Sequence, residues 1–207
     1  AGSVASYPYP YKSIPLSEVD FFGGTPHFGE FGYAMSKRHA YSYLKILKEV
    51  RGVDFTYGIF TNLYGEYDRF DSVSGHVIPS LISRAYQVSQ AGGELSVWGD
   101  GSAQRDFLHF DDAAAALVLC MNSNQDVELA NISSGEATSI KTLAGLVCKA
   151  AGLGDATFLV DKPVGVQSRV VDDSIISSLG FKKATDLEVG IPRLYNWYAE
   201  NIGDVRV

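Results

Sequence analysis

The sequence lacks several features that would define whole classes of protein. No apolar run reaches the roughly 18 residues of a membrane span, and no charged-then-apolar segment opens the chain as a secretory signal would. Basic residues are not in excess, because 17 Lys and Arg against 24 Asp and Glu give a formal net charge of −7. Nucleic-acid binders normally carry a basic face. We therefore expect no nucleic-acid partner, no membrane association and a cytoplasmic location.

Cysteines and metal ligands are also scarce. Cys120 and Cys148 both fall in apolar, helix-like segments, which favours reduced core residues, with a disulfide as the minor alternative. The four histidines are scattered without the spacing of metal ligands, so we expect no metal site. The 207 residues are 46% apolar and 20% charged, typical of a globular protein with one core or two small lobes.

Segments typical of strands and helices alternate along the chain. The first residues resemble the end of a strand that enters a loop rich in Tyr and Pro, and residues 33–51 predict a helix that stops at Gly52. A buried strand over 55–65 completes a strand–helix–strand order, which is typical of a parallel α/β unit. Further helices are expected from about Pro79, from Asp111, and over 139–153, 172–181 and 186–202; further strands over 94–101, 105–110, 128–138 and 157–163.

Several residues in these segments have structural interpretations. Asp111 and Asp112 mark a helix start, where carboxylates suit the free N–H groups and the positive end of the helix. Ser139 or Thr138 is expected to cap the helix that follows. Three aromatic residues of the last helix are interpreted as core or interface packing, and His109 as a strand-end residue; the aromatics are Tyr195, Trp197 and Tyr198.

Seven motifs stand in a fixed order: GSVASYP, YAMSK, TNLYG, HVIPSLI, VWGDGSAQRDFLHFDDAA, NISSG and KPVGVQSRVVD. A Tyr and a Lys four apart occur by chance, but the ordered series spans nearly the whole chain. It resembles the extended short-chain dehydrogenase/reductase family, the NAD(P)-dependent nucleotide-sugar epimerases, dehydratases and reductases. Within that family the sequence is most similar to the GDP-L-fucose synthases.

The resemblance implies a fold and a domain organisation. It implies an α/β fold with a partial Rossmann-type parallel sheet and a small α/β substrate-binding lobe. Residues 1–65 and 103–134 would form the Rossmann part, and residues 66–102 and 135–207 the nucleotide-sugar lobe. Family members begin with a strand, a GxxGxxG turn and a helix that hold the cofactor pyrophosphate, and this motif is absent here. We therefore expect a truncated chain, equivalent to the C-terminal part of such an enzyme, with an exposed sheet edge.

Tyr33 and Lys37 are the first candidate catalytic residues. Four residues apart on a helix, they share one face, and an ammonium group lowers the pKa of a nearby phenol toward useful acid–base work. The resemblance implies that Tyr33 exchanges a proton with the sugar oxygen and that Lys37 also holds the nicotinamide ribose. It implies that Ser3 hydrogen-bonds the same oxygen. The alternative is a chance pair on a surface helix.

His76 is the other catalytic candidate. A histidine titrating near pH 6.5 suits acid–base work, and the resemblance gives His76 this role during epimerisation. Ala5 stands where the family has a cysteine that is the partner of this histidine, which puts double epimerisation in doubt. The resemblance also implies that Asn62 and Leu63 contact the cofactor and that Asn62 contacts the substrate. The alternatives are a solvated loop histidine and a turn asparagine.

Three arginines and a tryptophan match positions around the nucleotide diphosphate: Arg84, Trp98, Arg105 and Arg169. The planar guanidinium donates paired, charge-assisted hydrogen bonds that suit a pyrophosphate, and an indole can stack near a base. The alternative for each arginine alone is a solvated surface charge.

The resemblance implies an NAD(P)-dependent epimerase/reductase acting on a nucleotide-linked 4-keto-6-deoxy sugar, with NADP as cofactor and NAD possible. It also implies a homodimer through the YxxxK helix, where Tyr41, Leu44 and Leu47 could face a partner or the chain's own core. Three alternatives stay open: a catalytically inactive nucleotide-sugar-binding remnant, a half-enzyme completed by a separate N-terminal chain, and a sugar-nucleotide 4-epimerase or dehydratase.

Overall fold

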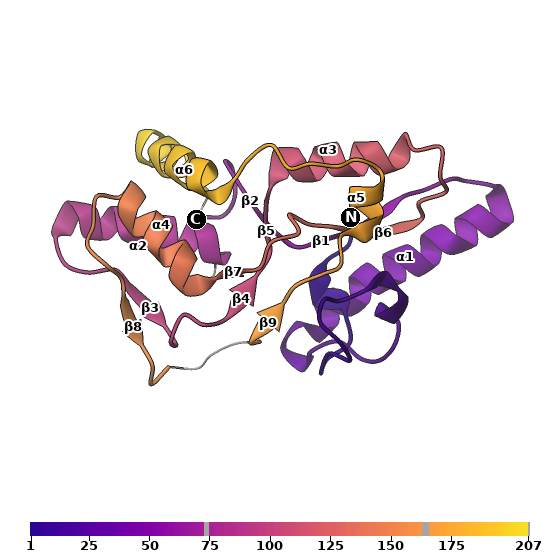
Figure 1. Cartoon of the computed structure of the whole chain (residues 1–207), viewed down its shortest axis with the longest axis horizontal. Helices are drawn as coiled ribbons and strands as arrows, with labels where there is room; N and C mark the ends of the chain where they lie inside the picture. The colour runs from indigo at the N-terminus through magenta and orange to yellow at the C-terminus, as the bar shows by residue number, and fades with distance from the viewer. Residues whose placement is uncertain (73–74, 163–165, 207) are drawn as a thin grey trace.

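A computed structural model describes residues 1–72, 75–162 and 166–206, and its described part is an α/β fold (Figure 1). The helices are α1 (Phe31–Arg51), α2 (Val77–Ala91), α3 (Phe110–Met121), α4 (Ile140–Ala150), α5 (Ser174–Ser178) and α6 (Leu187–Asn201). The strands are β1 (Tyr57–Phe60), β2 (Asn62–Tyr64), β3 (Ser96–Trp98), β4 (Gln104–Arg105), β5 (Phe107–His109), β6 (Leu129–Ile132), β7 (Thr138–Ser139), β8 (Thr157–Leu159) and β9 (Ser168–Arg169). Short 3-10 helices are η1 (Val4–Ser6), η2 (Glu18–Asp20) and η3 (Phe28–Glu30).

Parallel pairing dominates the described strands, which confirms the expected α/β class. β1 pairs with β6, β2 with β5, and β3 with β8, all parallel, while β4 lies between antiparallel β7 and parallel β9. The single strand expected over 55–65 is divided at Thr61. Its amide donates to the Ile132 carbonyl at 3.2 Å, and the next amide, of Asn62, donates to the Asp106 carbonyl at 3.2 Å. The chain thus changes partner strand at this residue.

Side chains of β1 alternate between two helical layers, and Figure 1 shows α1 and α3 on opposite sides of this strand. Tyr57 and Ile59 are buried in a cluster that Tyr41 and Leu44 of α1 pack against. A Cβ at Gly58 would point the other way, into the Leu117 side chain of α3. Because side chains alternate along a strand, one face of β1 packs against α1, the helix that carries the YxxxK motif. Tyr41 and Leu44 therefore pack on the chain's own core.

Some local expectations are confirmed and others are wrong. Ser139 caps α4 by accepting the Thr142 amide at 3.0 Å, as expected. Asp111 and Asp112 lie in the first turn of α3, as expected, but the cap is the His109 ring, which accepts the Asp111 amide at 3.3 Å. Asp112 instead accepts the amides of residues 184 and 185, at 2.9 and 3.0 Å. Asp112 is buried, so its carboxylate needs hydrogen-bond donors, and a neighbouring segment of the chain supplies them.

The beginning of the chain also differs from expectation. Residues 1–3 belong to none of the described strands, although the Gly2 amide donates to the Gly58 carbonyl at 2.7 Å. The end of the strand expected over 157–163 falls on residue 163, outside the described residues. The remaining helices form where expected, with ends that differ by a few residues.

The apolar core forms three clusters. The largest joins α2, α4 and α6, which gather at one end of the molecule in Figure 1, and contains the buried Tyr195 and Tyr198 with Trp197 packed against them. The other two flank β1 and β6. We propose that the largest cluster is the core of the expected substrate lobe and that the other two belong to the Rossmann part. Ile176 of α5 is buried in one of the two clusters that flank β1 and β6.

Asp106 is a fully buried carboxylate at the junction of these parts. One carboxylate oxygen accepts the Thr61 hydroxyl at 2.9 Å and the Ser134 amide at 2.9 Å, and the other accepts the Gly135 amide at 3.1 Å. Burial raises the pKa of Asp106, and the donors around it oppose that effect. Its backbone carbonyl also accepts the Asn62 side-chain amide at 2.9 Å. One residue therefore connects β1, β2, β5 and the loop after β6.

We predict that Asp106→Ala lowers the free energy of unfolding by about 3 kcal/mol, because it leaves buried donors without an acceptor. Asp106→Asn should lower it by only about 1 kcal/mol, because one carboxamide oxygen can still accept two of the donors. Urea denaturation measures both values. Equal losses for the two variants would show that the side-chain acceptors are not what stabilises the junction.

Candidate active site

The helix α1 carries both residues of the YxxxK motif. It runs unbroken to Gly52, whose backbone is left-handed (φ 66°), as a helix C-terminus favours. The Lys37 ammonium lies 5.6 Å from the centre of the Tyr33 ring and donates to the Ala1 carbonyl at 3.1 Å. Tyr33 is 54% exposed. The cation thus lies beside a solvent-accessible phenol.

Tyr57 of β1 holds this part of α1 in place. Its hydroxyl donates to the backbone carbonyl of Lys37 at 2.7 Å. Burial, and then the nearby Tyr33, raise the pKa of Tyr57 to about 12, so it remains a neutral donor at physiological pH. Gly2 lies against the same ring, and a Cβ at this glycine would collide with it. The helix α1 and the start of the chain are therefore both held against one aromatic side chain.

Arg38 joins α1 to the loop that contains Ser3. The guanidinium is buried and donates to the carbonyls of Ser6 and Gly24 at 2.8 and 2.6 Å. In return the Ser6 hydroxyl donates to the carbonyl of Ala34 at 3.2 Å. Ser3 caps η1, with its hydroxyl oxygen accepting from an amide two residues later at 3.2 Å. These contacts fix the position of Ser3 relative to the helix that carries Tyr33.

A cavity of about 620 Å³ brings all of the expected catalytic and cofactor residues together. Its lining also includes Ala5 and the apolar side chains of Phe60 and Leu117. The predicted residues that line it are Ser3, Tyr33, Lys37, Asn62, Leu63, His76 and Arg169. A hydroxyl, a phenol, a cation and an imidazole thus share one cavity with apolar walls, which suits a flat ring and a polar sugar together.

His76 lies at the entrance to α2, where it is the N-cap residue. Its side chain is 78% exposed, and its Nδ1 atom lies 3.3 Å from Oδ1 of Asp68. The hydrogen bond to Asp68 raises the pKa of His76, against the opposing effect of burial. The imidazole is therefore near a carboxylate that favours its protonated form.

Arg169 reaches the cavity from β9 but is already paired. Its two terminal nitrogens donate to the two carboxylate oxygens of Glu30 at 3.0 and 2.6 Å, and Nε donates to the Tyr11 hydroxyl at 2.8 Å. Such a bidentate pair fixes the guanidinium plane and offsets its charge. The pair connects the turn before α1 to the strand β9, and Glu30 also lines the cavity.

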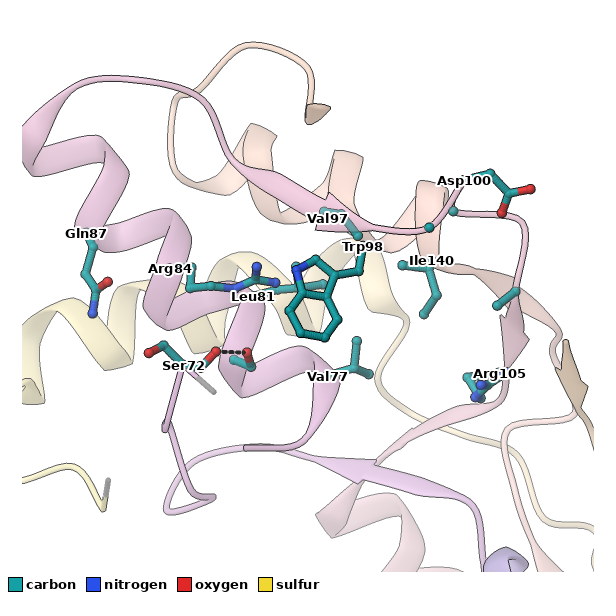
Figure 2. Close-up of a pocket in the computed structure, with 14 residues that line it drawn as sticks. Ser72, Val77, Leu81, Arg84, Gln87, Val97, Trp98, Asp100, Arg105 and Ile140 are labelled. Carbon is teal, nitrogen blue, oxygen red and sulfur yellow. Dashed lines mark hydrogen bonds between the residues drawn. The ribbon is translucent and has the colours of Figure 1, made fainter. Parts of the chain in front are cut away.

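A second cavity of about 520 Å³ contains the other predicted arginines and the tryptophan (Figure 2). Arg84 donates to the Ser96 carbonyl at 2.9 Å, and among the described residues its buried Nε has no hydrogen-bond partner. In Figure 2 its guanidinium extends from α2 toward the indole of Trp98, which is 65% exposed. Burial and the neighbouring Arg169 lower the pKa of Arg105. Both cationic side chains therefore face this cavity without a described carboxylate pair.

A smaller cavity of about 180 Å³ lies between the other two. It shares Asn62, Leu63 and His76 with the first cavity, and Arg105 with the second. The three spaces therefore follow one another along the molecule. An elongated ligand with a reactive ring at one end and an anionic group toward the other fits this order.

Three residues of the site were not found from the sequence and belong to no motif considered. Glu30 and Asp68 contact the predicted residues Arg169 and His76, and Arg38 binds the backbone of Ser6 and Gly24. Glu30 and Arg38 carry no local signal, because their partners lie 14 to 139 residues away along the chain. Asp68, which follows TNLYG by a few residues, is the one that a search of that motif's flanks could have found.

Two kinds of site are absent from the part of the chain that the structure describes. Within residues 1–72, 75–162 and 166–206 there is no group of three or more His, Cys, Asp or Glu side chains that could hold a metal ion. Within the same ranges, every helix is too short or too polar to cross a membrane. Cys120 and Cys148 are buried and free, as expected.

Comparison with known proteins defines the class. Residues 1–133 match the model of the NAD dependent epimerase/dehydratase family. The chain belongs to this family, which confirms the resemblance found in its motifs.

Individual relatives narrow the comparison. The chain is 34% identical over 205 residues to a GDP-L-fucose synthase of Sinorhizobium fredii, covering 98% of this chain and 65% of that protein. A crystal structure of a GDP-L-fucose synthetase from Naegleria fowleri bound to NADP superposes with a TM-score of 0.90 at 29% identity, covering 100% of this chain and 67% of that one. A GDP-6-OMe-4-keto-L-xylo-heptose reductase from C. jejuni has a TM-score of 0.84 at 25% identity, covering 97% and 69%. The chain thus spans about two thirds of the length of these relatives.

Proposed function

We propose that the whole protein is an NAD(P)-dependent epimerase/reductase of a nucleotide-linked 4-keto-6-deoxy sugar. One observation carries the proposal: Ser3, Tyr33, Lys37 and His76 line a single cavity that continues into the one lined by Arg84 and Arg105. The similarity to GDP-L-fucose synthases supports a guanosine diphosphate sugar as substrate. The similarity to an NADP-bound structure supports NADP as the cofactor.

The residues of the larger cavity fit the nicotinamide half of a dinucleotide. Its apolar wall includes Leu63 and Phe60, and the Lys37 ammonium can donate to ribose hydroxyls. We assign Tyr33, Lys37, Asn62 and Leu63 to this half. When bound, the cofactor supplies or accepts a hydride.

The chain's own residues would handle the proton. Tyr33 would donate its phenolic proton to the sugar oxygen during reduction, and Lys37 would stabilise the phenolate that results. Ser3 would donate a hydrogen bond to the same oxygen and fix its position. Ala5 lines this cavity and offers no group that transfers a proton. This favours reduction of the keto group over double epimerisation, with His76 as the remaining acid–base group.

The second cavity would hold the nucleotide diphosphate. Arg84 and Arg105 would donate to its phosphate oxygens, and Trp98 would stack near the base. Arg169, although paired with Glu30, lies beside Arg105 across the β4–β9 register and adds positive charge there. In Figure 2 the Asp100 carboxylate points away from these arginines, and it accepts from Ser102 instead.

We predict that this chain binds GDP in calorimetric titration and that Arg105→Met weakens binding about tenfold or more, because a hydrogen bond to a charged group contributes about 1.5–3 kcal/mol. Arg51→Met is the matched control, since Arg51 is exposed at the far end of α1. UDP in place of GDP tests the base. Tighter binding of UDP would move the proposal to the 4-epimerases of the family, and no binding of either nucleotide would refute it.

We further propose that the protein is a homodimer through α1. Five exposed apolar side chains recur every three to eight residues along one side of this helix: Phe31, Met35, Tyr43, Ile46 and Val50. Tyr41 and Leu44 face the chain's own core instead. An apolar stripe of this length on a surface helix is typical of an interface.

We expect sedimentation equilibrium to show a dimer that Ile46→Glu converts to a monomer, because a charge in an apolar interface loses its hydration. Val189→Glu, at an exposed apolar position of α6, is the control and should leave the dimer intact. A monomeric unmodified chain would contradict the proposal.

A further inference from the structure

Charged groups of both signs surround His76. Its ring borders three cavities: the one with Tyr33 and Lys37, the small one with Arg105, and one of about 250 Å³ with Glu66 and Asp68. Ligands entering from either neighbouring cavity would meet this imidazole. Its protonation state therefore decides whether it can act as an acid or only as a base.

Most charged groups around His76 oppose its protonation. It caps the N-terminus of α2, a helix of 15 residues whose positive end disfavours a cation. Lys37 and Arg169 line the first cavity with it, and Arg105 lines the small cavity. The carboxylate of Glu66, on the third side, is already bound by Arg193 at 3.0 Å. Without another anion, the neutral imidazole would be favoured at pH 7.

The carboxylate of Asp68 is that anion, and contacts within its loop fix its position. Its two carboxylate oxygens lie 3.3 and 3.4 Å from Nδ1 of His76, and its side chain is 20% exposed, far less than the histidine. The preceding residue, Tyr67, has a left-handed backbone (φ 71°), and its ring packs edge-on to Trp197 at 5.2 Å. The Asp68 carboxylate also accepts the Arg69 amide at 2.7 Å. The carboxylate is thus oriented before any ligand binds.

We propose that Asp68 is the positioning residue of His76: its carboxylate accepts a hydrogen bond from Nδ1–H, which leaves Nε2 as the nitrogen that exchanges a proton with the substrate. In the protonated ring both nitrogens carry a proton. The Nε2 proton passes to the substrate, and the neutral ring keeps its Nδ1 proton, which stays hydrogen-bonded to the Asp68 carboxylate. The carboxylate fixes the tautomer and stabilises the imidazolium, as a carboxylate does in other histidine–carboxylate pairs. This role rests on the proposed function of His76 and names the group that tunes it.

The test is an NMR titration of the histidine rings in this chain, with the His76 signal assigned from His76→Gln. Asp68→Asn should lower the pKa of His76 by about one unit, because an opposite charge at this distance is lost. The ring nitrogen shifts should also show loss of the Nδ1–H tautomer. Asp68→Glu, which keeps the charge, should restore part of the pKa and of the tautomer.

Asp155→Asn is the matched control. This substitution removes the same charge, and Asp155 is exposed in the loop before β8. It should leave the His76 titration in place. Equal shifts in Asp68→Asn and Asp155→Asn, or no shift in either, would overturn the proposal. The signals of the other histidines report on folding in each variant.

This titration needs neither cofactor nor substrate. An unperturbed His76 in Asp68→Asn, with GDP still bound by the chain, would refute the pairing and keep the proposed function. A lowered pKa of His76 in Asp68→Asn, in a chain that binds no nucleotide, would support the pairing and refute the proposed function. In an active protein the pH profile of Asp68→Asn should move about one unit toward acid, a change that a purely structural role would not produce.

Discussion

The buried carboxylate of Asp106 is the interaction on which the arrangement of the site depends. It binds Thr61 at the point where β1 gives way to β2, and it binds the loop after β6. In extended backbone, consecutive side chains point to opposite sides. Arg105 can therefore line a cavity while Asp106 is buried beside it. A second contact, from the Asn62 side chain to the Asp106 carbonyl, holds Asn62 at the edge of the cavity that contains Tyr33 and Lys37.

Electrostatics explains how a protein of net charge −7 can offer a site for an anion. Among the described residues that line the two larger cavities, the cations are Lys37, Arg84, Arg105 and Arg169. The carboxylate of Glu30 lines the cavity of Tyr33 and Lys37 but is paired with Arg169. The local field is set by nearby groups in a partly enclosed space, where charges are screened less than on the open surface. Three of these cations, Lys37, Arg105 and Arg169, line cavities that His76 also borders, and they disfavour its protonated form.

The sequence predicts the parts of this structure that depend on local patterns. The helix of YxxxK, its glycine stop and the Ser139 cap follow from propensity and capping chemistry, and all three are confirmed. The ordered motifs predict the α/β class and the family, and the structure brings the predicted residues Ser3, Tyr33, Lys37 and His76 to one cavity.

What the sequence does not predict depends on contacts between distant segments. Glu30 and Arg169 are 139 residues apart, so no local pattern could indicate their pairing. The carboxylate of Asp112 was expected to accept amides at the start of its own helix, but it accepts those of a segment 72 residues later. The division of strand 55–65 at Thr61 follows from the neighbours of each half, which the periodicity of the strand itself does not contain.

The most direct test of the account is whether Tyr33 donates the proton in a reduction. The measurement is NADPH oxidation by the whole protein with GDP-4-keto-6-deoxymannose. It compares Tyr33→Phe with Tyr86→Phe, because Tyr86 packs against the cluster of α2, α4 and α6 and does not line the cavity. We expect Tyr33→Phe to lower the rate by about 10²–10⁴-fold, the usual contribution of a general acid, and Tyr86→Phe to leave it nearly unchanged. Equal rates for Tyr33→Phe and the unmodified protein would contradict the assignment of this cavity as the active site.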